Sequence, residues 1–430
     1  MRDKTYDTNT DLYEKAILVS LITPETKRAG GDPEHSLEEL AQLAETAGVE
    51  VLSVMVQNKE SRDTKWFIGK GKVEELRAAA DELGATTAIF DQELSGAQVR
   101  NLEEALDLKI VDRTQLILDI FAQRAKTREG IIQVELAQLS YLLPRLSGHG
   151  KNLSRLGGGI GTRGPGESKL ETDRRHIRGR ISELKAHLEE VVRHRKLHRE
   201  RRKKSGVTQV ALVGYTNAGK STLLRELTSA DVYVENQLFA TLDPTSRTME
   251  LPNGREIVLT DTVGFIQNLP HDLVAAFRAT LEEVNEADVV LHVVDCSSPM
   301  REEQMAVVED LLGELGASGK PTITLFNKKD LYEGDPGQMI RATSGESLVI
   351  SAYEADDLER LRLAVQDMLT GSTLTFALPV NRGDLIALAY RSGEVLGSDT
   401  AEDGETVHIT VQVSRSHYEK SGYQLQPYLV

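Results

Sequence analysis

GYTNAGKS, at residues 214–221, has the residue types and spacing of a phosphate-binding loop. The apolar run VTQVALV precedes it and the helix-forming STLLRELT follows, so a strand, a glycine-containing turn and a helix start come in that order. This order is typical of a loop that binds phosphate through backbone N–H groups and the helix dipole. Gly214 and Gly219 let the backbone bend, Lys220 would reach the β- and γ-phosphates, and Ser221 would ligate Mg²⁺.

Downstream of this loop, DTVGF at 261–265 follows the apolar strand pattern IVLT. Asp261 would hold the magnesium shell through water, and the N–H group of Gly264 would meet the γ-phosphate. Phe265 stands where many nucleotide hydrolases carry a water-orienting glutamine. A phenyl ring cannot orient water by hydrogen bonding, which predicts slow intrinsic hydrolysis and a partner that stimulates it. The alternative is that Phe265 packs against the switch while another polar side chain orients the water.

NKKD at 327–330 ends a further apolar strand, TITLF. The carboxylate of Asp330 can accept both N–H donors of guanine, which adenine does not offer in that arrangement. At the next strand end, LVISAY places Ser351 and Ala352 where a backbone N–H group can meet the carbonyl oxygen of the base. The motifs therefore predict GTP and GDP, rather than ATP, as the bound nucleotides.

FATLDPT at 239–245 falls where the first switch should lie, between the phosphate loop and the strand that ends at Asp261. Thr241 is the preferred second Mg²⁺ ligand beside Ser221, and Thr245 is its competitor. The catalytic roles are assigned to Lys220, Thr241 and Gly264. The predicted nucleotide-contacting residues are Gly214, Tyr215, Thr216, Asn217, Ala218, Gly219, Lys220, Ser221, Phe239, Ala240, Thr241, Leu242, Asp243, Asp261, Thr262, Val263, Gly264, Asn327, Lys328, Lys329, Asp330, Ser351, Ala352 and Tyr353.

Residues 12–114 alternate short apolar runs with helical patterns in a βαβαβαβ order. This order predicts a small parallel sheet with helices packed on it. WFIGKGKVEEL at 66–76 places glycines ahead of the second helix, where backbone N–H groups could bind an anion. A plain strand-to-helix turn is the alternative for this segment.

Apolar residues at helical spacing predict one long helix over 115–146, and a second helix is expected over 169–204. The glycine-rich segment SGHGKNLSRLGGGIGTRGPGE, which joins them, carries the cations Lys151, Arg155 and Arg163. Residues 151–204 hold 17 Lys/Arg against 7 Asp/Glu, while the whole chain has a net charge of -16. Such local cationic charge predicts a polyanionic partner met at the tip of a helical hairpin, with a solvated helix and a mobile linker as alternatives.

The composition, 40% hydrophobic and 27% charged over 430 residues, predicts several globular domains. The expected boundaries are 1–114 for an N-terminal α/β subdomain, 115–204 for the hairpin, 205–371 for a P-loop GTPase domain, and 372–430 for a small C-terminal α+β domain. This last domain is expected to contain a strand, a helix and a strand, in that order, with an acidic turn between them. No apolar run approaches the length of a membrane span, and the only cysteine, Cys296, fits a packing role. We expect a cytoplasmic protein without a membrane span, monomeric when free.

Several of these strings together resemble the HflX family of translation-factor-class GTPases. They are GYTNAGKSTL, FATLDPT, DTVGFIQNLPHDLVAAFRATLEE, NKKD, QVELAQLSYLLPRL and GGGIGTRGPGESKLETDRR. The resemblance covers roughly residues 12–370 and implies the domain order above, together with binding to the large ribosomal subunit, including its RNA. It also implies, in some members, separation of stalled ribosomes under stress. Only the resemblance indicates a ribosome, since composition alone suggests no more than a polyanion.

The resemblance also bears on a second cation. Asn217, in the loop, is similar to the asparagine of potassium-stimulated relatives, which implies K⁺ beside Mg²⁺, although a local hydrogen-bonding role is an equal alternative. Two other functions compete with a ribosome-binding GTPase switch. One is an NTP-dependent RNA remodeller with a second nucleotide in the N-terminal sheet. The other is an assembly module that uses GTP only for its structure.

Overall fold

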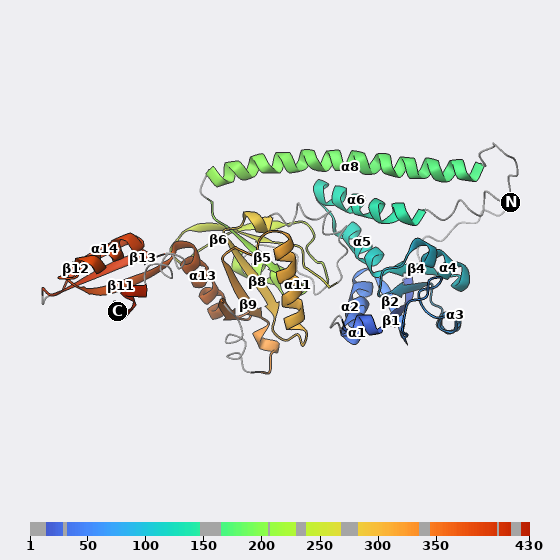
Figure 1. The fold of residues 1–430 in the computed structure, drawn as a ribbon, viewed down its shortest axis with the longest axis horizontal. Helices are drawn as coiled ribbons and strands as arrows, with labels where there is room; N and C mark the ends of the chain where they lie inside the picture. The colour runs from blue at the N-terminus through green and yellow to red at the C-terminus, as the bar shows by residue number, and fades with distance from the viewer. Residues whose placement is uncertain are drawn as a thin grey trace, which may run out of the picture. The chain divides into compact units, whose positions relative to one another are not determined.

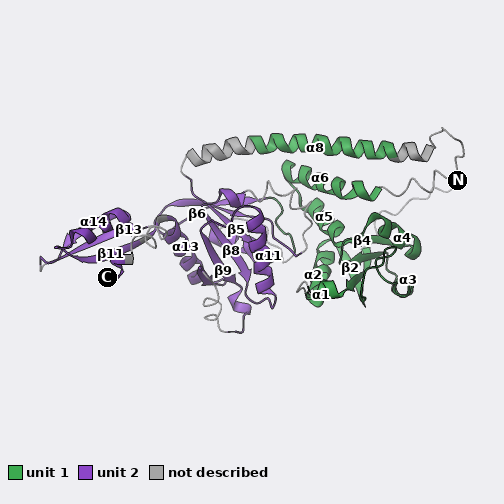
Figure 2. Cartoon of the chain, viewed as in Figure 1, with its two compact units in different colours: residues 1–199, 235–243, 268–279 green, residues 200–234, 244–267, 280–430 purple. Residues whose placement is uncertain are grey.

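A computed structural model describes residues 14–28, 32–146, 165–204, 207–228, 238–267, 283–334, 345–401, 404–413 and 423–430. The chain forms two compact units (Figure 2). Unit 1 comprises residues 1–199, 235–243 and 268–279, and unit 2 comprises residues 200–234, 244–267 and 280–430. The chain therefore returns to unit 1 after unit 2 has begun, and it leaves again between Asp243 and Pro244.

Unit 1 contains a four-stranded parallel sheet in the order β2-β1-β3-β4 (Figure 1). Its elements are β1 (Glu14–Ile22), α1 (Pro24–Arg28), α2 (Pro33–Thr46), β2 (Val49–Asn58), α3 (Lys70–Leu83), β3 (Thr87–Phe90), α4 (Gly96–Leu106) and β4 (Lys109–Asp112). The predicted parallel α/β arrangement is confirmed. Central strands are buried on both faces, as the continuous apolar run of β1 requires. Gly69 is the N-cap of α3 and Gly71 lies in the first turn of this helix, and the N–H group of Gly69 donates to Oε1 of Gln57 at 2.8 Å.

The segment after β4 contains two helices, so the prediction of one long helix over 115–146 is wrong. The helices are α5 (Arg113–Arg124) and α6 (Arg128–Arg145). Ala125 turns to an extended conformation, with φ -64° and ψ 116°. Thr127 then starts α6 as its N-cap, because its hydroxyl accepts a hydrogen bond from the N–H group of Gly130 at 3.0 Å. Helical periodicity runs through this break and hides it in the sequence.

The second half of the hairpin is α8 (Pro165–Lys204), a helix of 40 residues. Leu184 of α8 is buried against Ile132 and Leu136 of α6. Arg180 of α8 donates from Nε and Nη2 to the two carboxylate oxygens of Glu135 on α6, at 2.7 and 2.9 Å. This paired contact fixes the register of the two helices.

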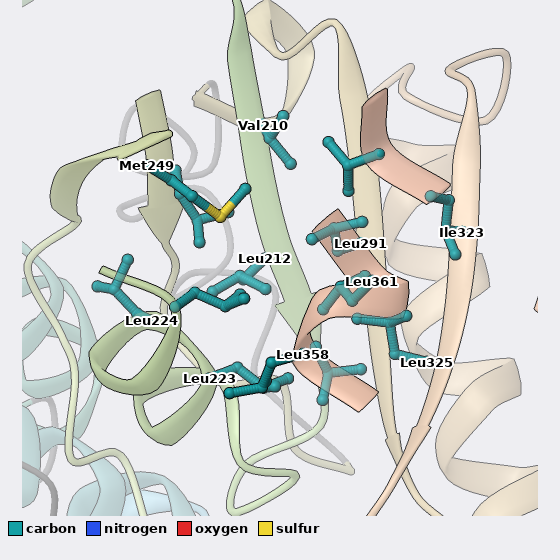
Figure 3. Packing of buried hydrophobic residues seen from close by; sticks show 14 of the residues in the cluster. Val210, Leu212, Leu223, Leu224, Met249, Leu291, Ile323, Leu325, Leu358 and Leu361 are labelled. Atoms are coloured by element: carbon teal, nitrogen blue, oxygen red, sulfur yellow. The ribbon is translucent and has the colours of Figure 1, made fainter. Parts of the chain in front are cut away.

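Unit 2 is built on a six-stranded sheet in the order β10-β9-β8-β5-β7-β6, in which only the β6–β7 pair is antiparallel. Its elements are β5 (Gln209–Gly214), α9 (Lys220–Thr228), β6 (Thr245–Glu250), β7 (Glu256–Asp261), β8 (Val289–Asp295), α11 (Arg301–Glu314), β9 (Thr322–Asn327), the 3₁₀ helix η3 (Lys329–Leu331), β10 (Glu346–Val349) and α13 (Ala355–Thr370). Leucines from α9, β5 and α13 pack together on one face of this sheet (Figure 3). The carboxyl ends of parallel strands in such sheets form the ligand edge.

The C-terminal part of unit 2 is a three-stranded antiparallel sheet in the order β11-β13-β12. Its elements are β11 (Ser372–Pro379), α14 (Gly383–Ser392), β12 (Glu394–Thr400), β13 (Thr406–Val413) and the 3₁₀ helix η5 (Tyr423–Tyr428). Phe376, Ile409 and Leu425 are fully buried in its core. The predicted order of strand, helix and strand is present in β11, α14 and β12, and a further strand, β13, which the prediction lacked, follows.

Cys296 follows β8 and is fully buried in a small cluster with Val294, Phe326 and Val349. Burial raises the pKa of the Cys296 thiol to about 11, with a smaller contribution from Asp295. The packing role expected for this residue is confirmed. Within the described parts of the chain, no helix is both long and apolar enough to cross a membrane.

Candidate functional site

The loop between β5 and α9 bends at two glycines that accept no side chain. Gly219 has φ 98°, and a Cβ atom there would collide with Nδ2 of Asn327. A Cβ atom at Gly214 would collide with the carbonyl oxygen of Val293 on β8. Asn217, between them, adopts a left-handed conformation with φ 59°. The loop is therefore shaped by its contacts with neighbouring strand ends.

Lys220 is buried at the first position of α9, with 6% of its surface exposed. Its Nζ donates to the carbonyl oxygens of Gly214 and Tyr215 at 3.0 and 2.8 Å. Burial lowers the pKa of Lys220 to about 8, and the nearby Asp261 carboxylate opposes this effect. The ammonium group thus lies against the loop, where a polyphosphate would meet it.

His292 on β8 is a buried titratable group that the sequence analysis did not single out. Burial, with a smaller contribution from the charge of Lys220, lowers its pKa to about 4. The imidazole is therefore neutral at physiological pH, so Lys220 has no second positive charge beside it. The signal for this residue in the sequence is one histidine inside the otherwise apolar run VVLHVV.

Ser221 and Asp261 supply oxygen atoms at adjacent strand and helix ends. The Ser221 hydroxyl donates to Oδ2 of Asp261 at 2.6 Å, and Asp261 is fully buried at the end of β7. Hydroxyl and carboxylate oxygens are the donors that Mg²⁺ prefers, so this pair fits the ion that P-loop GTPases generally use. No group of three or more His, Cys, Asp or Glu side chains in the described ranges could hold a metal by itself.

The residues after Asp261 are tied to the phosphate loop through the backbone. Thr262 donates its hydroxyl to the carbonyl oxygen of Leu212 at 2.7 Å. The N–H group of Phe265 donates to the carbonyl oxygen of Gly214, and the Phe265 carbonyl oxygen accepts from Thr216. A Cβ atom at Gly264 would lie 2.8 Å from Cα of Thr216 and 3.2 Å from Nζ of Lys220, so this glycine allows the close approach of the phosphate loop.

The Phe265 side chain is buried, with 1% of its surface exposed. It packs inside unit 2 and presents no polar atom to a nucleotide. Val263 is also buried, at 5% exposure. The structure thus shows that the Phe265 side chain is packed in the protein interior.

Asn327 links the phosphate loop to the base-recognition strands. Its Nδ2 donates to the Ala218 carbonyl oxygen at 2.9 Å, and its Oδ1 accepts from the N–H group of Ala352 at 3.1 Å. The Ser351 hydroxyl donates to Oδ1 of Asp330 at 2.7 Å and orients that exposed carboxylate. These bonds bring residues from three separate motifs to one edge of the sheet.

The two lysines of NKKD are held by carboxylates that the sequence analysis did not identify. Lys328 pairs with Asp295 at 2.6 Å, and Nζ of Lys329 lies 2.7 Å from both Glu354 and Asp357. Hydrogen bonds to Asp357 and Glu354 raise the pKa of Lys329. Asp357 also accepts from the N–H group of Ser351 at 2.9 Å, so it supports the base-recognition loop. Tyr353 is 71% exposed beside this loop.

The predicted switch residues at 239–243 belong to unit 1. Phe239 and Leu242 are buried there, while Ala240, Thr241 and Asp243 are partly exposed. Thr245, the competitor of Thr241, is the first residue of β6 in unit 2 and pairs with Asp261 of β7. The tip cations Lys151, Arg155 and Arg163 lie outside the described residues.

The lowered pKa of Lys220 predicts a pH dependence of nucleotide affinity. Phosphate binding favours the ammonium form and raises its pKa in the complex, so binding takes up a proton once the free protein has lost it. We expect GDP affinity to be highest below about pH 8, where Lys220 is protonated. Above about pH 8 the affinity should fall by up to about tenfold per pH unit. Fluorescence titration between about pH 7 and about pH 9 measures this slope. Guanosine, which has no phosphate, is the control; an equal slope for both ligands would contradict the prediction.

Comparisons with known proteins find matches along most of the chain. Three family models match consecutive parts of the chain: GTP-binding GTPase N-terminal at 34–122, GTP-binding GTPase Middle Region at 124–202, and 50S ribosome-binding GTPase at 209–328. The crystal structure of a GTP-binding protein from the hyperthermophilic archaeon Sulfolobus solfataricus in complex with GDP has a TM-score of 0.45 and 25% identity. That alignment covers 82% of this chain and 98% of the archaeal chain.

Curated relatives match along nearly their whole length. GTPase HflX of Caldanaerobacter subterraneus is 51% identical over 93% of this chain and 91% of its own. GTPase HflX of Escherichia coli is 43% identical over 94% of both chains. The resemblance seen in the motifs is thereby confirmed. The chain belongs to the HflX family of GTPases, which hydrolyse GTP.

Proposed function

We propose that this GTPase binds the large ribosomal subunit and uses its GTP-bound state to separate stalled or idle ribosomes under stress. The observation that carries the proposal is the burial of Phe265, which leaves the usual water-orienting position without a polar side chain. Hydrolysis is then slow in the free protein, and a partner completes the site. The family model described as a 50S ribosome-binding GTPase supports the ribosome as that partner.

The site residues take the following roles in the proposal. Lys220 neutralises charge on the β- and γ-phosphates, and Gly264 donates its N–H group to the γ-phosphate. Asp330 accepts from guanine, and the backbone beside Ser351 meets the base carbonyl. When bound, Mg²⁺ neutralises charge that develops on the phosphates. The residues that would hold it are Ser221 and Thr241 directly, and Asp261 through water.

Asn217, which has a left-handed backbone conformation in the loop, is the residue proposed to favour K⁺. The hairpin of unit 1 supplies the RNA contact, because residues 151–204 carry a local charge of +10 on a chain of net charge -16. Lys151, Arg155 and Arg163 are the proposed contacts to ribosomal RNA. The protein would act in the cytoplasm as a free monomer that associates with ribosomes.

The test is GTP hydrolysis with and without purified large ribosomal subunits. We expect stimulation on the order of 100-fold or more, because the ribosome supplies the group that Phe265 cannot. Lys220→Ala is the control, and it should abolish turnover under both conditions. Equal rates with and without subunits would mean that the water-orienting group already lies in this chain.

A second nucleotide in the N-terminal sheet receives no support from the structure. Asp91 directly follows β3 at the carboxyl end of this strand, where such a ligand would bind, and it pairs with the buried Arg113. Its guanidinium group donates to Glu39 at 2.6 Å and to Asp91 at 2.9 and 3.1 Å. The charge of this group is thus matched within the protein, and the surrounding carboxylates would repel phosphate.

A further inference from the structure

The segment 239–243 is bound at the junction between α5 and α6 through Asp243, and we call this binding position its seat. The Asp243 carboxylate accepts from the N–H groups of Lys126 and Thr127, both at 2.9 Å. It also accepts from the Thr127 hydroxyl at 2.5 Å. Thr127 is the N-cap of α6, so the carboxylate lies at the positive end of an 18-residue helix. Three charge-assisted hydrogen bonds make this a strong and directional contact.

Gly130 in the first turn of α6 makes room for this carboxylate. A Cβ atom at Gly130 would collide with Oδ1 of Asp243. Glycine in a helix costs about 1 kcal/mol relative to alanine, so the helix itself gives no reason for it. The need to accommodate the Asp243 carboxylate explains the glycine at position 130, so the sequence of α6 is adapted to this contact.

Phe239 anchors the other end of the same segment. It is 2% exposed and adopts φ 54°, a left-handed conformation that is unfavourable for a residue with a bulky side chain. Its ring packs edge-on against Phe121 of α5, with ring centroids 4.7 Å apart. Thr241 therefore lies between two anchors on unit 1, and after Asp243 the chain enters unit 2.

We propose that Asp243, seated on Thr127, is a positioning residue for GTP hydrolysis. It holds the 239–243 segment so that Thr241 keeps a fixed position between its two anchors, Phe239 and Asp243. This inference rests on the proposed metal-ligand role of Thr241. It adds that residues at the start of α6, far in sequence from every nucleotide motif, set the rate of the reaction.

Gly130→Ala is the decisive variant, because it displaces Asp243 without removing any polar group and improves the helix propensity of α6. We expect kcat for GTP hydrolysis by the full-length protein without ribosomes to fall by about 10- to 100-fold, with GDP affinity unchanged. Gly179→Ala on α8 is the matched control, since a Cβ atom there has nothing within 4 Å. It should leave both quantities unchanged.

Thr127→Val should lower kcat in the same way, and Thr127→Ser, which keeps the hydroxyl, should restore it. Unchanged or faster hydrolysis in Gly130→Ala would overturn the inference. An equal loss of GDP affinity would overturn it too, since that would indicate general damage to unit 2. Because no ribosome is present, these results are independent of ribosome binding. The failure of one proposal can therefore be told from the failure of the other.

Discussion

Asp330→Asn is expected to lower the affinity for GTP on the order of 10³-fold and to give the protein a preference for xanthosine triphosphate. The carboxylate offers two acceptors, which match the two N–H donors of guanine. An asparagine amide offers one acceptor and one N–H donor, and this pair matches the carbonyl group that xanthine carries instead of an amine. The Ser351 hydroxyl can still donate to the remaining oxygen at position 330, so the side chain keeps its orientation.

Competition binding with GTP, GDP and xanthosine nucleotides measures this exchange of base preference. Asp356→Asn is the matched control, because Asp356 is an exposed carboxylate in the first turn of α13 and undergoes the same loss of charge. It should leave the preference for guanine intact. Equal weakening of both nucleotides in Asp330→Asn, with no change of preference, would place base recognition elsewhere.

Gly219→Ala is expected to weaken GDP and GTP binding by about 100-fold or more, which corresponds to about 3 kcal/mol. The backbone at φ 98° lies outside the conformations that alanine adopts readily, and the new methyl group would collide with the amide of Asn327. Relief of the collision must move Asn327, which also donates to Ala218 and accepts from Ala352. The substitution therefore disturbs the phosphate and base contacts together.

Calorimetric titration with GDP and thermal unfolding together separate this loss from general instability. Gly254→Ala in the β6–β7 turn is the control, since Gly254 has φ 79° but open space around its Cβ position. We expect it to lower the free energy of unfolding by about 1 kcal/mol without changing GDP affinity. Should both variants bind GDP like the wild type, the collision with Asn327 would be irrelevant to the site.

Much of the nucleotide edge is predictable because its signals are local. The phosphate loop, DTVGF and NKKD each follow a buried strand, and parallel strands bring their carboxyl ends to one edge. The same reasoning finds the parallel sheet of unit 1. Contacts between distant positions have no such signal. Asp243 and Thr127 are 116 positions apart, and nothing in either stretch indicates the other.

The two helices α5 and α6 show why local patterns can also mislead. Apolar spacing continues across residues 125–127, so periodicity predicts one helix where the backbone turns. The break is stabilised by the Thr127 cap and by Asp243 from another part of the chain. Asp357 was missed for a similar reason. Asp357 reaches Lys329 and Ser351 only because α13 packs beside them. In the sequence, a carboxylate in the first turn of a helix is common, since it interacts favourably with the helix dipole.

The burial of Cys296 has a practical consequence for labelling chemistry. Thiol reagents attack the thiolate, and a fully buried thiol with its pKa raised to about 11 forms almost none at neutral pH. No other cysteine occurs in the chain. A cysteine introduced at any exposed position would thus be the single reactive thiol in an otherwise native sequence. Fluorophores and spin labels can be attached there one site at a time, with Cys296 left in its core.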